Sequence, residues 1–241
     1  MIRAILFDLD ETLFDHRAAV AHAVTAWTES ASPGHPLLAD GPALWLALED
    51  RHVPAWHAGQ CSFAEQRRRR VREYCDRLAI ATPSDPDAAY DAFLTLYEQA
   101  WTAFADAAPA IAALGGRGLT LGVLTNGMLV QQEAKLRRIG LADLLDPVLS
   151  PDALGAFKPS AACYLAAAAK LGLRPEQVLM VGDNLRLDAL GALRAGMRGV
   201  WLDRHGDGTT DDGALDGAAG SVERVTSLLQ LLALLRTPAL V

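Results

Sequence analysis

Two aspartates, Asp8 and Asp10, stand directly after the first apolar segment of the 241-residue chain. Carboxylates beside a buried segment are costly unless they hold a cation or perform chemistry. Side chains alternate along an extended chain, so Asp8 and Asp10 point to the same side. Asp183 follows another apolar segment, and Asp188 lies about one helical turn further on. Asp8, Asp10 and Asp183 are therefore candidate oxygen ligands, a set that suits Mg²⁺ far better than zinc.

Two other segments carry groups that bind anions. Residues 125–127 read Thr-Asn-Gly between an apolar segment and an expected helix. A hydroxyl and backbone N–H groups at the positive end of a helix dipole can hold a phosphate. Lys158 also precedes an expected helix and would add a positive charge. Singly, such residues are more often helix caps, turns or solvated lysines, but their shared placement after strands favours a common function.

The elements that position these residues alternate between strand and helix. Buried parallel strands are expected at four continuous apolar runs, with 147–149 as a weaker fifth: 2–7, 119–124, 178–181 and 199–202. Helices are expected at 128–139, 160–171 and 185–195, each followed by a glycine suited to a left-handed C-cap. This alternation predicts a doubly wound, Rossmann-like α/β sheet, whose ligands bind beyond the carboxyl ends of the strands.

A long segment without strand patterns separates the first two expected strands. It is too long for one crossover connection, so we predict an inserted α-helical domain at 15–104. Residues 1–14 and 105–241 would together form the α/β domain. A surface loop is expected at 206–220 and a last amphipathic helix at 221–235.

Two helix starts are visible within the insert. A capping box at 62–65 opens one helix, and residues 84–87 open another. The first helix carries four consecutive arginines, 67–70, which point about 100° apart and cannot form one patch. We favour a solvated helix with acidic partners one turn away. The alternative is one arginine that reaches inward toward a second anionic group on a substrate.

Composition excludes several classes of protein. Apolar residues make up 51% of the chain, and its net charge of −7 argues against a nucleic-acid partner. Cys61, Cys75 and Cys163 form no C-x-x-C pair and fit a reduced chain. There is no run of roughly 18 apolar residues and no signal-peptide pattern. We expect a cytoplasmic monomer or homodimer without a membrane partner.

The four segments together resemble the motifs of the haloacid dehalogenase-like hydrolase superfamily. Residues 8–12, 125–126, 158–159 and 182–188 match these motifs in order and spacing. The helical insert is similar to the α-helical cap of that family, which would close over the site and select the substrate. One departure is Ser160, where many relatives carry an acidic residue.

The resemblance implies a phosphatase that forms an aspartyl-phosphate from a small phosphorylated metabolite. Asp8 would be the nucleophile. Mg²⁺ would be held by Asp8, by Asp183 and by the main-chain carbonyl of Asp10. The Asp10 side chain would act as general acid toward the leaving oxygen and then as base for the hydrolytic water.

The resemblance also assigns the groups that surround the phosphate. Lys158, the hydroxyl of Thr125 and the backbone N–H of Asn126 would bind its oxygens. Asp188 would hold Lys158 or a metal-bound water, and Thr12 would likewise support the residues in contact with the metal.

Other activities remain open on the same scaffold. The dehalogenases of the superfamily use the nucleophile without the second aspartate or a metal. A halide leaves without a proton and an alkoxide needs one, so Asp10 favours a phosphatase over a 2-haloacid dehalogenase. A phosphotransferase such as a sugar phosphomutase would use the same residues. A non-catalytic binding protein is disfavoured because no motif residue is missing.

Overall fold

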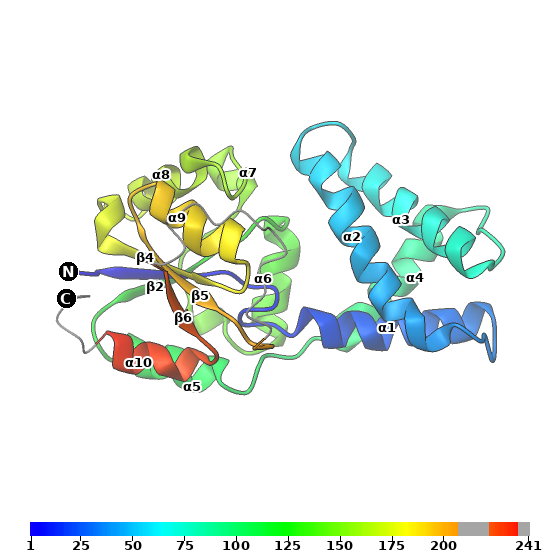
Figure 1. The fold of residues 1–241 in the computed structure, drawn as a ribbon, viewed down its shortest axis with the longest axis horizontal. Coiled ribbons are helices and arrows are strands. Elements are labelled where there is room, and N and C mark those ends of the chain that lie inside the picture. The colour runs from blue at the N-terminus through cyan, green and yellow to red at the C-terminus, as the bar shows by residue number, and fades with distance from the viewer. Residues whose placement is uncertain (207–221, 236–241) are drawn as a thin grey trace. The chain divides into compact units, whose positions relative to one another are not determined.

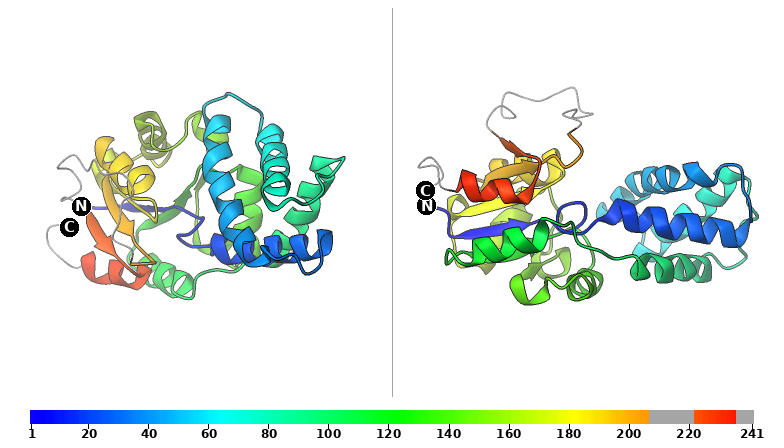
Figure 2. Two further views of the ribbon diagram at one scale, coloured as in Figure 1. Left: turned by 45° about the vertical axis from the view of Figure 1, so that its right-hand side comes forward. Right: turned by 90° about the horizontal axis from the view of Figure 1, so that it is seen from below.

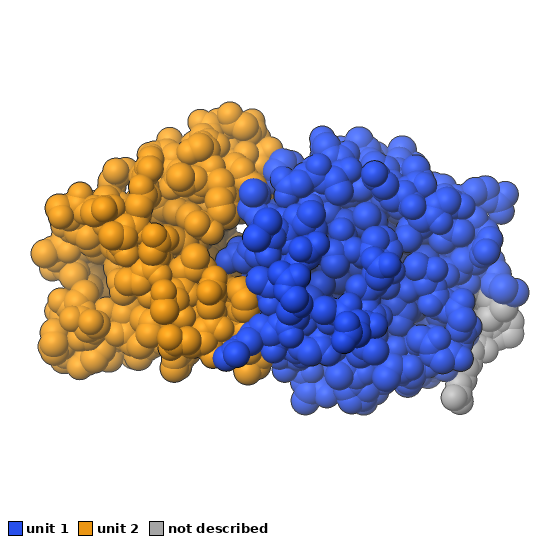
Figure 3. Space-filling model, turned by 180° about the vertical axis from the view of Figure 1, so that it is seen from behind, with its two compact units in different colours: residues 1–15, 103–241 blue, residues 16–102 orange. Residues whose placement is uncertain are grey.

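The computed structural model describes residues 1–206 and 222–235 and divides into two compact units (Figure 3). Unit 1 comprises Met1–Asp15 and Ala103–Val241, and unit 2 comprises His16–Thr102. The domain boundaries expected from the sequence lie within two residues of these divisions. The loop expected at 206–220 falls, apart from its first residue, outside the described part of the chain.

Unit 1 is built on a six-stranded parallel sheet with the strand order β3-β2-β1-β4-β5-β6 (Figure 1). The strands are β1 Ala4–Phe7, β2 Thr120–Leu124, β3 Val148–Leu149, β4 Val178–Gly182, β5 Arg198–Leu202 and β6 Glu223–Val225. β1 pairs with β2 and β4, and all four of its residues are buried. Helices cover both faces, which explains the continuous apolar runs. The predicted doubly wound α/β fold is confirmed.

The helices of unit 1 form layers on both sides of the sheet. α5 and α10 pack together on one face, and α8 and α9 lie on the other (Figures 1 and 2). The α-helices are α5 Ala107–Gly115, α6 Leu129–Arg138, α7 Pro151–Leu154, α8 Ala161–Lys170, α9 Gly191–Arg194 and α10 Leu231–Leu234; short 3-10 turns occupy Ala142–Leu144, Pro175–Gln177 and Leu228–Gln230. The predicted C-cap glycines Gly140, Gly172 and Gly196 all have positive φ.

Two expected helices of unit 1 have a different structure. Residues Leu185–Leu190 form a π-helix (η4) that continues into α9, not one α-helix. The hydroxyl of Tyr164 donates a hydrogen bond to the carbonyl of Leu187 and thereby takes this acceptor out of the regular helical pattern. The prediction of one helix at 221–235 is also wrong, because this segment contains β6, a 3-10 turn and α10. β6 is a short edge strand with only Val225 buried, so it shows no alternating pattern.

Unit 2 consists of helices. They are α1 His16–Ala31, α2 Gly41–His57, α3 Phe63–Leu78 and α4 Pro86–Gln99, with a 3-10 turn (η1) at Leu38–Asp40. Both predicted helix starts are confirmed: Ser62 accepts a hydrogen bond from the N–H of Glu65, and Asp85 caps α4. Trp45 is buried between the rings of Tyr74 and Phe93. In the described residues of both units, no helix is long and apolar enough to cross a membrane.

The four arginines of α3 differ in their surroundings. Arg68 and Arg69 are exposed or nearly so and pair with acidic residues, as the solvated interpretation predicts. That interpretation is wrong for Arg70, which is 3% exposed, forms an ion pair with Glu49 and donates to Tyr90 Oη at 2.8 Å. Burial opposes the Glu49 carboxylate, yet His16 and Arg70 lower its pKa to about 2. Arg70 therefore neutralises a charge inside the helical unit.

Replacing Arg70 is expected to destabilise the protein far more than replacing its exposed neighbour. Arg70→Met removes the arginine partner of the largely buried Glu49 carboxylate, and among the described residues His16 still contacts it. Breaking a buried ion pair costs roughly 3 kcal/mol of the free energy of unfolding. Arg69→Met, the matched control on the same helix, should change it by about 0.5 kcal/mol or less. Urea titration followed by circular dichroism measures both, and equal losses would show that Arg70 is not a structural ion-pair partner.

Candidate active site

The centre of the site is a buried ammonium between two carboxylates. Asp8 follows β1, and Lys158 precedes α8. Lys158 Nζ lies 2.6 Å from Asp8 Oδ1 and 2.7 Å from Asp188 Oδ1. All three residues are buried. The structure thus brings together residues 150 positions apart in the chain, with the lysine held from two sides.

The carboxylate of Asp188 has a tightly fitted place. Its second oxygen accepts a hydrogen bond from the backbone N–H of Asn184 at 3.0 Å. A Cβ on Gly182 would lie only 2.1 Å from this oxygen, so glycine is required at the end of β4. The π-helix carries Asp188 at this position. Both oxygens therefore have partners, and Asp188 serves here to hold Lys158.

Asp183 is fixed by Thr12. The Thr12 hydroxyl accepts from the backbone N–H of Asp183 at 3.0 Å and donates to its Oδ1 at 3.3 Å. The indole N–H of Trp201 donates to the Asp183 carbonyl at 2.8 Å. These contacts connect the segment after β1 to the segment after β4.

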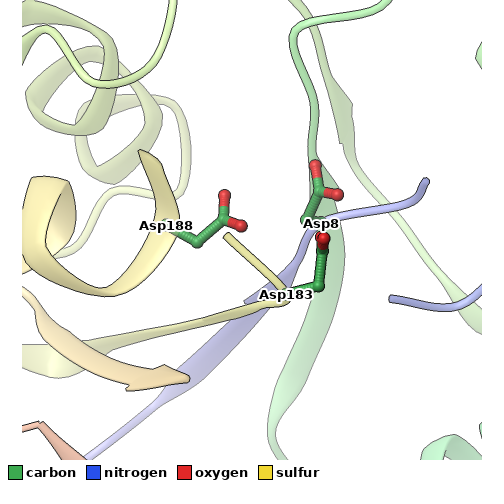
Figure 4. Close-up of side chains that lie close together, drawn as sticks. All are labelled: Asp8, Asp183 and Asp188. Atoms are coloured by element: carbon green, nitrogen blue, oxygen red, sulfur yellow. The ribbon is translucent and has the colours of Figure 1, made fainter. Parts of the chain in front are cut away.

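Three carboxylates converge at this point with one ammonium among them. Asp8 and Asp183 follow the central strands, Asp188 comes from the next helix, and their side chains face one region (Figure 4). One oxygen from each lies within 4.8 Å of the others. Within the described residues, the second oxygens of Asp8 and Asp183 accept no hydrogen bond. Three carboxylates and one ammonium carry a formal charge of −2. This charge, together with the two carboxylate oxygens that accept no hydrogen bond among the described residues, fits a divalent cation that prefers oxygen ligands, such as Mg²⁺.

The electrostatics of the cluster favour a bound cation. Burial is the main effect that raises the pKa of Asp8 to about 7. Lys158 lowers this pKa, whereas repulsion from Asp188 and Asp10 raises it further. Burial and repulsion from Asp8 also raise the pKa of Asp183 well above its usual value. Burial disfavours the Lys158 ammonium, but Asp188 and Asp8 outweigh it and raise its pKa. A divalent cation would relieve the repulsion among the carboxylates.

The Thr-Asn segment after β2 connects to the lysine segment. Asn126 Nδ2 donates to the Lys158 carbonyl at 2.9 Å, and Asn126 Oδ1 accepts from the Lys158 backbone N–H at 2.7 Å. The Asn126 side chain thus braces the backbone that carries the lysine. Thr125 is buried, and its Oγ1 accepts from the backbone N–H of Gly127 at 3.0 Å. The binding of phosphate by these two residues stays a prediction.

Asp10 lies at the rim of the cluster with its side chain about one-third exposed. It forms an ion pair with Lys135, and its Oδ2 accepts a hydrogen bond from Gln132 Nε2 at 2.9 Å. Sequence reasoning missed these two residues of α6. The sequence nevertheless carries a signal, because Leu129, Gln132 and Leu136 share the spacing of one helix face, and a polar residue interrupts that apolar stripe.

Comparisons with known proteins agree with this geometry. The chain is 29% identical over 204 residues to a ribulose-1,5-bisphosphate 5-phosphatase from Halopiger xanaduensis, covering 84% of this chain and 85% of that protein. It is 30% identical over 209 residues to an (S)-2-haloacid dehalogenase from Pseudomonas sp. strain YL, covering 86% and 84%. The HAD hydrolase YfnB from Bacillus subtilis has the same fold, with a TM-score of 0.81 at 21% identity over 98% of this chain and 99% of that one.

These relatives include both a phosphatase and a dehalogenase, which act on different substrates. The haloacid dehalogenase-like hydrolase family matches residues 2–196, which include every motif residue considered above. The chain is a hydrolase and belongs to the haloacid dehalogenase-like hydrolase family.

Proposed function

We propose that this hydrolase is a Mg²⁺-dependent phosphatase that acts on a small phosphomonoester metabolite through an aspartyl-phosphate at Asp8. The observation that carries the proposal is the carboxylate cluster of Asp8, Asp183 and Asp188, which retains an excess of negative charge beside a buried lysine. Attraction of a phosphate dianion to such a site requires a cation. Displacement of a halide from a neutral carbon has no such requirement.

Each residue has a distinct task in the proposed reaction. Asp8 attacks phosphorus, and Mg²⁺, which Asp8 and Asp183 would hold, would offset the negative charge of the phosphoryl group. Lys158, 2.6 Å from Asp8, adds a second positive charge beside the attacking group. Asp10 gives a proton to the leaving alkoxide and later takes one from the water that hydrolyses the aspartyl-phosphate. The phosphatase among the relatives supports this activity.

A second candidate, 2-haloacid dehalogenase, is favoured by the relative of that name at 30% identity. In a dehalogenase, Asp8 would attack carbon, and Asp10 would have no role as a general acid because a halide leaves without a proton. Asp10 is nevertheless held by two buried side chains of α6. Because a phosphatase needs Asp10 for proton transfer and a dehalogenase does not, these contacts support the phosphatase.

Metal removal separates these activities. The purified protein is assayed for phosphate release from sugar phosphates, nucleoside monophosphates and other small phosphomonoesters, and for halide release from 2-halo acids. We expect phosphate release that is lost after EDTA treatment and dialysis and restored by Mg²⁺. Halide release that survives chelation, without phosphate release, would establish the dehalogenase instead. Phosphoryl transfer to a second sugar phosphate without free phosphate would indicate a phosphotransferase.

A further inference from the structure

Two polar side chains on α6 converge on one carboxylate of the site. Gln132 and Lys135 are one turn apart, so they lie on the same face of the helix. They are 1% and 3% exposed. Gln132 Nε2 donates to Asp10 Oδ2 at 2.9 Å, and Lys135 pairs with Asp10 Oδ1. Each oxygen of the Asp10 carboxylate therefore has its own donor, which fixes both its position and its plane.

Burial of these two side chains is unfavourable unless it serves a purpose. Lysine and glutamine are among the residues least often buried, and a buried polar atom without a partner costs free energy. Gln132 Oε1 is buried and has no hydrogen-bond partner among the described residues. The Lys135 ammonium lies 4.7 Å from the centre of the Phe14 ring, and this cation–π contact also stabilises its charge. The arrangement is directed at Asp10.

Gln132 also reaches a second group of the site. The same Nε2 donates to Thr125 Oγ1 at 2.7 Å. That hydroxyl oxygen already accepts from the N–H of Gly127, so both of its lone pairs are occupied. Its own proton must therefore be donated elsewhere, and it has no acceptor among the residues described by the structure. Gln132 thus leaves Thr125 as a hydrogen-bond donor, the role needed to bind a phosphoryl oxygen.

Glycine at position 127 makes this arrangement possible. A Cβ on Gly127 would lie 2.4 Å from Gln132 Nε2 and 2.6 Å from its Cδ. The amide group would have to move away from Asp10 and Thr125. The Thr-Asn-Gly segment therefore contacts Gln132 through Thr125 and Gly127, and it contacts Lys158 through Asn126.

We propose that Gln132 and Lys135 are positioning residues of the reaction. Lys135 acts through Asp10, whereas Gln132 acts through both Asp10 and Thr125. This inference rests on the proposed function, because it requires Asp10 to transfer protons. Neither residue transfers a proton itself; each holds the group that does.

The test compares Lys135→Met and Gln132→Leu with matched changes on the same helix, Arg138→Met and Gln131→Leu. Wild type is first assayed with Mg²⁺ on alkyl and aryl phosphates. Absence of phosphate release there would overturn the proposed function and leave no reaction for these residues to support. If wild type is active, Lys135→Met and Gln132→Leu should each lower kcat on alkyl phosphates roughly 10- to 100-fold. This loss is a part of the usual contribution of general acid–base catalysis. The control variants should stay near the wild-type rate.

Three readouts distinguish positioning from a general structural effect. In the first turnover, Lys135→Met should release aryl alcohol at the wild-type rate, because that leaving group departs without a proton. Lys135→Met should cause no further loss of kcat in the Asp10→Asn background, since its effect passes through Asp10. Gln132→Leu should raise KM in both backgrounds, because Thr125 loses its orientation.

Equal losses in the first chemical step on alkyl and aryl phosphates, or additive losses in the Asp10→Asn background, would overturn the inference, and so would wild-type kinetics. Thermal melting checks that the variants are folded. If Lys135→Met does not fold, Lys135→Arg and Lys135→Gln replace it. The arginine variant keeps a cationic donor and should retain most of the activity on alkyl phosphates, whereas the glutamine variant should show the loss. Equal activity of these two variants would also contradict the proposal.

Discussion

Asp8→Asn is expected to abolish the hydrolysis of phosphate esters, with kcat reduced by roughly 10⁵-fold. An amide is a poor nucleophile, and the removal of a covalent nucleophile has effects of this size in well-studied hydrolases. No neighbouring group can replace Asp8: Asp188 has both oxygens occupied by Lys158 and the Asn184 N–H, and Asp183 is held by Thr12. Phosphate release at saturating substrate and Mg²⁺ measures the loss.

The control experiment checks that the Asp8→Asn variant is folded. Asparagine has nearly the same shape as aspartate, and its carbonyl oxygen can still accept from Lys158. Circular dichroism and thermal melting should therefore resemble those of wild type. A folded Asp8→Asn protein that retains more than about one-hundredth of the wild-type rate would exclude Asp8 as the nucleophile.

Asp10→Asn is expected to separate the two chemical steps. On alkyl phosphates, kcat should fall by roughly 10²–10⁴-fold, the usual contribution of general acid–base catalysis. On an aryl phosphate, the first step should stay fast because the leaving group needs no proton. The second step should be slow because the attacking water has lost its base. We expect a burst of aryl alcohol equivalent to about one molecule per site, followed by slow turnover.

Stopped-flow absorbance with Mg²⁺ present measures both phases in the wild type and the variant. Wild type should show little or no burst when dephosphorylation is fast. Hydrolysis of an alkyl phosphate by Asp10→Asn at the wild-type rate would show that Asp10 neither gives nor takes the proton.

The placement of the motif residues could be predicted because local patterns determine it. The β1 segment is apolar throughout and ends just before Asp8, and β4 likewise ends just before Asp183. Parallel strands bring their carboxyl ends to one edge of a sheet, so their acidic residues meet once the two strands pair. Helix starts such as Ser62 also depend only on neighbouring residues.

Other features depend on contacts between distant segments. The burial of Arg70 needs Glu49 from another helix, and the π-helix around Asp188 involves the hydroxyl of Tyr164. Four successive arginines look alike in a sequence, and only helix packing turns one of them inward. Lys135 joins Asp10 across 125 positions. Partners of this kind follow from the tertiary structure, because no local pattern names the group at the other end.

Chemical trapping of the intermediate tests the proposed function most directly. Asp10→Asn is mixed with Mg²⁺ and an aryl phosphate, quenched after the burst, and treated with sodium borohydride, which reduces an acyl phosphate to an alcohol. Peptide mass spectrometry then locates the reduced residue. The proposed mechanism predicts conversion of the Asp8 side chain to that of homoserine, and no conversion when Mg²⁺ or the ester is omitted. A burst with an unmodified Asp8, or with the modification at another residue, would contradict an aspartyl-phosphate at Asp8.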